Sequence, residues 1–164
     1  MLAKTWASAM ILMSMPTLAL ADSQSDCQAA GGSYLRGVVV SRPQFRRGTE
    51  FPHGVELSHT HLRLRPDGDR GTYDIAMDNV FASGYDRAGE AVPAPLAQIT
   101  PGDHLELCGK PYSSGYGMDW VHTNCGDTPT SQTPDGWTKI IAPDGTLSAN
   151  LEGSTEYCGL WKRR

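Results

Sequence analysis

The sequence predicts a single all-β domain, and three observations support this prediction. Short runs of alternating apolar and polar residues recur along the chain, as in strands that bury one face. Turn signals separate these runs, and the tripeptide Pro-Asp-Gly occurs three times, starting at residues 66, 134 and 143. The chain also contains 18 Gly and 11 Pro, a composition that argues against a helical bundle.

The strand pattern can be followed in order along the chain. In residues 59–65, His and Arg occupy the odd positions, while Thr60, Leu62 and Leu64 occupy the even ones. One face of this strand is therefore polar and the other belongs to the core. A long connection is expected at 88–100, which contains two prolines. The expected strands are 34–41, 57–65, 72–81, 104–109, 118–125, 137–141 and 147–151.

Five strands with a long insertion between the third and the fourth are the layout of an OB-like barrel. We therefore expect a five-stranded OB-like antiparallel barrel, stapled by disulfides, as one domain over residues 22–164. Residues 142–164 would form a C-terminal extension of this barrel. A β-sandwich with more strands is the alternative fold.

The first 21 residues have the features of a secretory signal peptide. Lys4 gives a positive start, an apolar stretch follows, and Ala-Leu-Ala at residues 19–21 matches a cleavage site. We expect a periplasmic or secreted protein. Loss of Lys4 with the signal would change the formal net charge from −4 to −5. This acidic balance argues against bulk nucleic-acid binding, and no membrane span is expected in the mature chain.

Export would place the four cysteines in an oxidising compartment, where an even number indicates disulfides. Three pairings of Cys27, Cys108, Cys125 and Cys158 are possible. The favoured pairing is Cys108–Cys125 between neighbouring strands, nested inside Cys27–Cys158 at the chain ends. No C-x-x-C pair occurs, so a zinc–cysteine site is the weaker interpretation.

A polar face and two loops are the candidate ligand-binding features. In an OB barrel the ligand lies across the second and third strands, between the first loop and the loop that joins the last two strands. Here the first loop, 42–56, interleaves Arg with Phe, and the second, 111–117, carries two Tyr. Arg binds phosphate or carboxylate through a fork of donors, and aromatic rings stack on bases or sugars. The expected ligand-binding residues are His59, His61, Arg63, Arg42, Arg46, Arg47, Tyr112, Tyr116, Trp120 and His122.

These residues are compatible with three functions. The first is a binding module without a cofactor, for a small anionic or carbohydrate ligand or an acidic protein. The second is a metal-dependent hydrolase in which His59, His61 and His122 hold the metal and Asp119 or Glu106 serves as base. Two His at i, i+2 are a weak metal signal without a longer motif. The third is an inhibitor or immunity-type protein that acts through a protein interface.

Part of the chain also resembles a known family. The block Gly-Asp-His-Leu-Glu-Leu-Cys-Gly at 102–109, then Tyr112, Trp-Val-His at 120–122 and Gly-Trp at 136–137, is similar to small exported bacterial domains of unknown function. Their pattern is H-x-R-F, G-D-x-V-x-F-x-G-x-Y, H-W-T-H and G-W. The resemblance covers residues 58–146 and implies an OB-like barrel in which His59 and His122 share a site. This chain departs from it at His61-Leu62, at Asp119 and in its cysteines.

Overall fold

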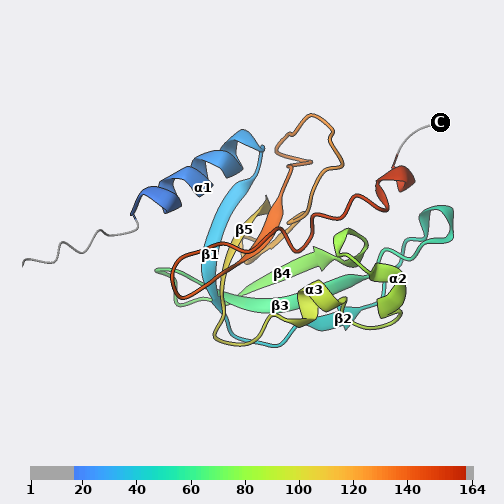
Figure 1. Ribbon diagram of the computed structural model, residues 1–164, viewed down its shortest axis with the longest axis horizontal. Coiled ribbons are helices and arrows are strands. Elements are labelled where there is room, and N and C mark those ends of the chain that lie inside the picture. Colours follow the sequence, from blue (N-terminus) through green and yellow to red (C-terminus); the bar gives the residue numbers. More distant parts are fainter. Residues whose placement is uncertain (1–16, 162–164) are drawn as a thin grey trace, which may run out of the picture.

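The computed structural model describes residues 17–161, and a closed barrel of five strands forms its centre (Figure 1). Each strand of the barrel pairs with two others, and β5 returns to β1 to complete the ring. The all-β prediction and the OB-like barrel are confirmed. The barrel strands are β1 (Ser33–Val39), β3 (His59–Pro66), β4 (Tyr73–Asp78), β5 (His104–Pro111) and β6 (Gly117–Asp119).

One pairing in the ring is parallel. The strand order is β1, β3, β4, β6, β5, and all pairs are antiparallel except β4 with β6. A ring with an odd number of strands cannot close through antiparallel pairs alone, so five strands require one such pair. The parallel pair lies between the third and fifth barrel strands and brings the end of β6 beside the polar face of β4.

Two strands differ from the sequence prediction. The strand expected at 118–125 ends at Asp119, because Trp120 has a φ of 53°, which extended backbone does not adopt. β7 (Trp137–Ile141) continues the wall by pairing with the first part of β5. The strand expected at 147–151 provides only a single bridge, between Ile141 and Leu147. A short strand that was not expected, β2 (Gln44–Arg46), pairs with β3.

The helices lie around the barrel and are short apart from the first. α1 (Thr17–Ala29) runs beside β1, away from α2 (Tyr85–Ala88) and α3 (Ala94–Ala97) in the view of Figure 1. Residues 1–16, which hold the start and most of the apolar stretch of the predicted signal, lie outside the described residues. Within the described part of the chain, no helix is long and apolar enough to cross a membrane.

The core confirms the predicted alternation of the strands. Leu62 and Leu64 on β3 and Ile75 and Met77 on β4 are at most 1% exposed. Burial of each such side chain stabilises the fold by about 1.5–3 kcal/mol. The odd residues of β3 and the even residues of β4 therefore face outward. The core also includes Leu105 and Leu107 of β5 and Leu96 and Ile99 of the β4–β5 connection.

The four cysteines form two disulfides, but the favoured pairing was wrong. Cys27 pairs with Cys108, and Cys125 pairs with Cys158. Cys108 lies on the outer face of β5, beside the chain that leaves α1. The left-handed bend at Trp120 ends β6, so the chain does not continue along β5 to Cys125. The chain-entropy model gives about 4–5 kcal/mol for Cys27–Cys108, which closes a separation of 81 residues.

Candidate functional site

The outer face of β3 and β4 is a ladder of polar side chains around one small residue. His59 lies opposite Asp78, His61 opposite Ala76, and Arg63 opposite Asp74. Side chains directly opposite one another on antiparallel strands share a face. Because Ala76 has only a methyl group, the middle of this ladder is hollow, and the longer polar side chains surround it.

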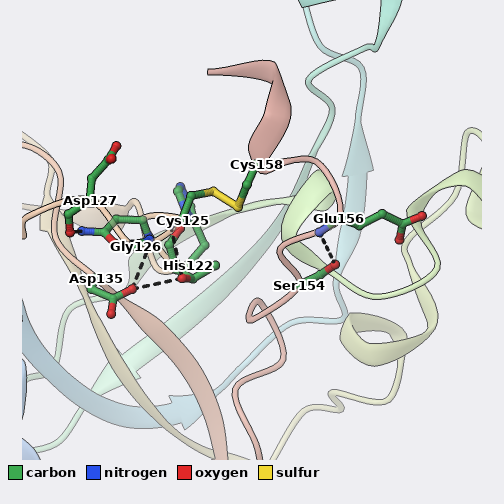
Figure 2. Close-up of a disulfide and its surroundings, with 10 residues drawn as sticks. His122, Cys125, Gly126, Asp127, Asp135, Ser154, Glu156 and Cys158 are labelled. Carbon is green, nitrogen blue, oxygen red and sulfur yellow. Dashed lines mark hydrogen bonds between the residues drawn. A yellow bond between two sulfur atoms is a disulfide. The ribbon is translucent and has the colours of Figure 1, made fainter. Parts of the chain in front are cut away.

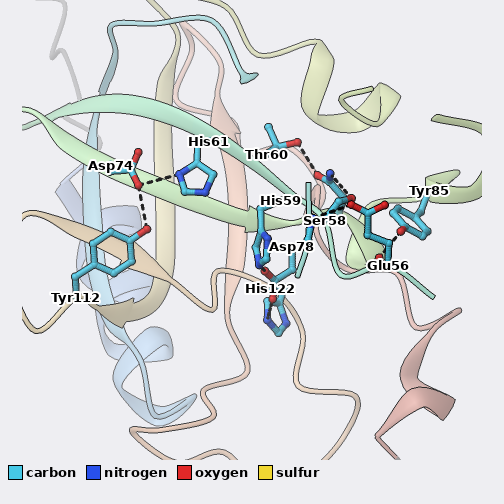
Figure 3. Close-up of polar contacts among 12 residues, drawn as sticks. Glu56, Ser58, His59, Thr60, His61, Asp74, Asp78, Tyr85, Tyr112 and His122 are labelled. Atoms are coloured by element: carbon cyan, nitrogen blue, oxygen red, sulfur yellow. Dashed lines mark hydrogen bonds and ion pairs between the residues drawn. The ribbon is translucent and has the colours of Figure 1, made fainter. Parts of the chain in front are cut away.

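Asp78 lies between two histidines (Figure 3). Its Oδ1 is 2.9 Å from Nε2 of His59, and its Oδ2 is 3.0 Å from Nε2 of His122. Burial alone would raise the pKa of Asp78, but the two imidazoles outweigh it and hold this pKa well below its usual value. The contact with Asp78 in turn raises the pKa of His59, although burial opposes the shift.

His122 is the most buried histidine of the cluster, at 2% exposure. Its Nδ1 donates to the carbonyl oxygen of Thr123 at 2.7 Å. Its other ring nitrogen, Nε2, faces Oδ2 of Asp78. Within residues 17–161, Nε2 has no aligned hydrogen-bond partner, so its 3.0 Å contact with Asp78 is close but is not a directed hydrogen bond.

A second histidine–carboxylate pair lies next to the first. Nδ1 of His61 is 2.9 Å from Oδ2 of Asp74, and the hydroxyl of Tyr112 donates to the same oxygen at 3.1 Å (Figure 3). Burial and Asp74 raise the pKa of Tyr112 above its usual value, so this hydroxyl stays protonated. Tyr112 reaches Asp74 by crossing Gly117, where a Cβ would lie 2.4 Å from the ring.

Aromatic rings form the other side of the site. Phe81 stacks on His122 with centroids 3.8 Å apart, and Trp161 stacks on the same Phe81 at 5.2 Å. Trp120 lies 5.0 Å from His122. The Cys125–Cys158 disulfide joins the loop after His122 to the C-terminal segment that carries Trp161 (Figure 2). Trp161 is 46% exposed, so its ring remains accessible.

Most of these groups line one cleft of about 1050 Å³, and Asp74 lies outside its lining. Its floor is the outer face of β3 and β4, and its walls come from the β2–β3 loop, the end of β5, the segment after β6 and the C-terminal segment. The cleft is large enough for a drug-sized ligand. It is lined by Thr49, Glu50, Leu57, His59, His61, Ala76, Asp78, Val80, Phe81, Lys110, Tyr112, Asp119, Trp120, His122, Thr123, Asn124, Cys125, Asp127, Thr133, Cys158 and Trp161.

The cleft contains half of the residues expected to bind ligand. His59, His61, Tyr112, Trp120 and His122 line it. The other five lie outside its lining, namely Arg42, Arg46, Arg47, Arg63 and Tyr116.

The five residues outside the lining are on nearby surfaces. Arg46 pairs in register with His59, and Arg63 is two residues from His61 on β3. Arg47 forms an ion pair with Glu90. Tyr116 is 68% exposed at the tip of the β5–β6 hairpin, and Arg42 is exposed before β2.

The histidines do not form a metal-ligand set. Within residues 17–161, no three His, Cys, Asp or Glu side chains are grouped so that they could hold a metal ion. His61 is bound to Asp74, and Asp78 lies between the other two imidazoles. Of the two bases considered, Asp119 lines the cleft.

Glu106 lies elsewhere and accepts hydrogen bonds from Tyr34 and Trp137. It is 1% exposed on β5 and is not among the residues that line the cleft.

Three residues of the site region were not expected from the sequence. Strand alternation places Asp74 and Asp78 on one face, but nothing in the pattern distinguishes Asp78 as the partner of two histidines. Phe81 follows β4 in a 3-10 turn (Asn79–Phe81), where alternation no longer applies. Glu152 is fully buried, and within the described part of the chain neither of its carboxyl oxygens has a hydrogen-bond partner. Burial, with Asp78 nearby, raises its pKa well above the usual value.

The fold and the cleft define an OB-like barrel with a mixed imidazole, carboxylate and aromatic site on its β3–β4 face. No family model, curated protein or solved structure matches the chain. The resemblance to small exported bacterial domains therefore stays a prediction.

Proposed function

We propose that this chain is an exported binding module whose cleft takes a small ligand with an anionic group and a ring that can stack on aromatic side chains. The observation that carries the proposal is the position of His59 and His61 on the floor of the cleft, each with one ring nitrogen held by a carboxylate. The two disulfides support export, and they suit a periplasmic or secreted protein.

The anionic group is expected at the β2–β3 side of the face. His59, His61 and Arg63 project outward from β3, and Arg46 shares their face through its pairing with His59. Because Asp78 raises the pKa of His59, this imidazole keeps its charge to a higher pH than a free histidine. Four basic groups therefore lie along one short stretch of the sheet, although the whole chain is acidic.

The ring of the ligand is expected at the opposite wall. Trp161 and Trp120 offer aromatic surface beside His122, and such rings stack on sugars or bases. Glu50, Asp119 and Asp127 also line the cleft and can accept hydrogen bonds from hydroxyl or amino groups. Uronic acids and nucleotides combine an anionic group, a ring and such donors.

Isothermal titration calorimetry with glucuronate and uridine 3′-monophosphate tests this proposal, with glucose as the uncharged comparison. At least one of the two anions should bind and glucose should not. The double variant His59→Ala/His61→Ala should weaken binding at least about tenfold, or about 1.4 kcal/mol. His104→Ala, at the exposed start of β5, is the matched control. Equal affinity in both variants, or no binding of either anion, would overturn the proposal.

The described residues provide no contact that favours the metal-dependent hydrolase or the inhibitor hypothesis over this one. A protein partner retained without either anion would support the inhibitor hypothesis instead.

A further inference from the structure

Two neighbouring imidazoles in the cleft have the arrangement of an acid–base pair. The rings of His59 and His61 have centroids 6.3 Å apart and are inclined at 66°. Each is anchored through one nitrogen, Nε2 of His59 to Asp78 and Nδ1 of His61 to Asp74. Their side chains are 37% and 29% exposed, so the rings remain accessible from the cleft. Histidine is the side chain best suited to proton transfer near neutral pH.

Among the residues that line the cleft, no thiol, serine or threonine is activated by this pair. Its cysteines are both in the Cys125–Cys158 disulfide, and no serine lines it. Three threonines line it, and within the described residues none is hydrogen-bonded to either imidazole. A reaction that suits this site carries its own nucleophile and needs only a base and an acid. Phosphodiesters of ribose meet this requirement, because a 2′-hydroxyl lies next to the phosphorus.

We propose that this cleft cleaves short RNA, with His61 as the base and His59 as the acid. The 2′-oxygen attacks phosphorus and forms the new P–O bond, while Nε2 of His61 takes the 2′-hydroxyl proton. The P–O5′ bond breaks, and Nδ1 of His59 gives its proton to the leaving O5′. The products are a 2′,3′-cyclic phosphate and a free 5′-hydroxyl. The step needs no oxidant, reductant or other reactant, and solvent returns both imidazoles to their starting states.

The surroundings of the pair support these roles. The attacking and leaving oxygens lie on opposite sides of phosphorus, so the base and acid must be separated by a phosphate group. The ring centroids are 6.3 Å apart, close enough for one phosphate group in the cleft to contact both rings. Asp78 favours the protonated form of His59 by raising its pKa, which suits the acid. Arg46 and Arg63 lie on the same face for flanking phosphates, and OB barrels bind oligonucleotides on this face.

This inference rests on the proposed function, because a phosphate must first bind at the two histidines. The test incubates the mature, oxidised protein with a labelled RNA hexamer and with the DNA hexamer of the same sequence, both in a chelator. Mass spectrometry then identifies the products. The RNA should be cut to fragments ending in a 2′,3′-cyclic phosphate, and the DNA should stay intact because it lacks the 2′-hydroxyl.

Single variants distinguish this site from any other source of cleavage. His59→Ala and His61→Ala should each lower the rate about 100-fold or more, as expected for an acid–base residue. His104→Ala, purified in the same way, should retain the full rate. Thermal melting shows whether each variant is folded. If an alanine variant is unfolded, the corresponding glutamine variant, His59→Gln or His61→Gln, is used in its place.

The possible outcomes separate the two proposals. Binding of uridine 3′-monophosphate without RNA cleavage overturns the catalytic inference and leaves the binding module intact. Cleavage that is equal in all variants also overturns it. If neither binding nor cleavage occurs, both proposals fail.

Discussion

Asp78 and Glu152 are two carboxylic acids near the same site whose pKa values are shifted in opposite directions. The pKa of Asp78 is lowered by two imidazoles, whereas burial raises that of Glu152. Asp78 therefore favours the fold above its unfolded pKa, and that contribution is lost as pH falls through its folded pKa. Above the pKa that Glu152 has in the unfolded chain, near 4.3, the folded state still holds a proton that the unfolded state has released. Glu152 therefore lowers the stability of the fold as the pH rises above that value.

Replacing Glu152 with glutamine should therefore change the pH dependence of stability. Each unit by which its folded pKa is raised lowers the free energy of unfolding at neutral pH by about 1.4 kcal/mol. Glu152→Gln cannot ionise, so the variant should lose less stability than the parent between pH 5 and pH 8. Urea denaturation at both pH values measures this. Parallel losses of stability in parent and variant would show that Glu152 does not titrate differently in the fold.

At the scale of elements, the close approach of the β5–β6 hairpin to β4 completes one wall of the cleft. Gly117 starts β6 and pairs with Asp74, while the Tyr112 ring passes over it to reach the same Asp74. A Cβ at residue 117 would lie 2.4 Å from that ring and 2.5 Å from the Asp74 carbonyl oxygen. With a side chain at residue 117, either the Tyr112 ring or the backbone of β4 and β6 must therefore move.

Gly117→Ala should therefore destabilise the protein by about 1–3 kcal/mol, the usual range for overpacking. The near-ultraviolet circular dichroism should also change as Tyr112 moves. Gly159→Ala is the matched control, because within residues 17–161 no atom beyond its chain neighbours lies within 4 Å of its added Cβ. If the two variants melt alike, the close packing of Tyr112 on β6 is incorrect.

The elements also show how far the sequence could predict this molecule. Alternation in β3 and β4 identified the outward row of His59 and His61 and the core row of Leu62 and Leu64. Local patterns could not reveal the left-handed Trp120, which shortens β6 and turns the chain away from the predicted Cys108–Cys125 pairing. Phe81 and Glu152 join the site region only through folding, so their own sequence neighbourhoods gave no signal.

At the scale of the whole molecule, barrel closure gathers distant segments around one face. His59 and His61 come from β3, His122 comes from the segment after β6, and Trp161 comes from the C-terminal segment. The chain as a whole is acidic, with a formal net charge of −4. Any anion must therefore be held by local groups, and we expect its affinity to depend on the imidazoles more than on overall charge.

The most direct test of this account is a long-range ¹H–¹⁵N spectrum of the histidine rings, recorded on the mature, oxidised protein. It should be measured before and after saturation with uridine 3′-monophosphate. The ¹⁵N resonances of the His59 and His61 rings should shift on binding, while those of His53 and His104 should not. Shifts confined to His53 and His104, with the spectra of His59 and His61 unchanged at saturation, would contradict it.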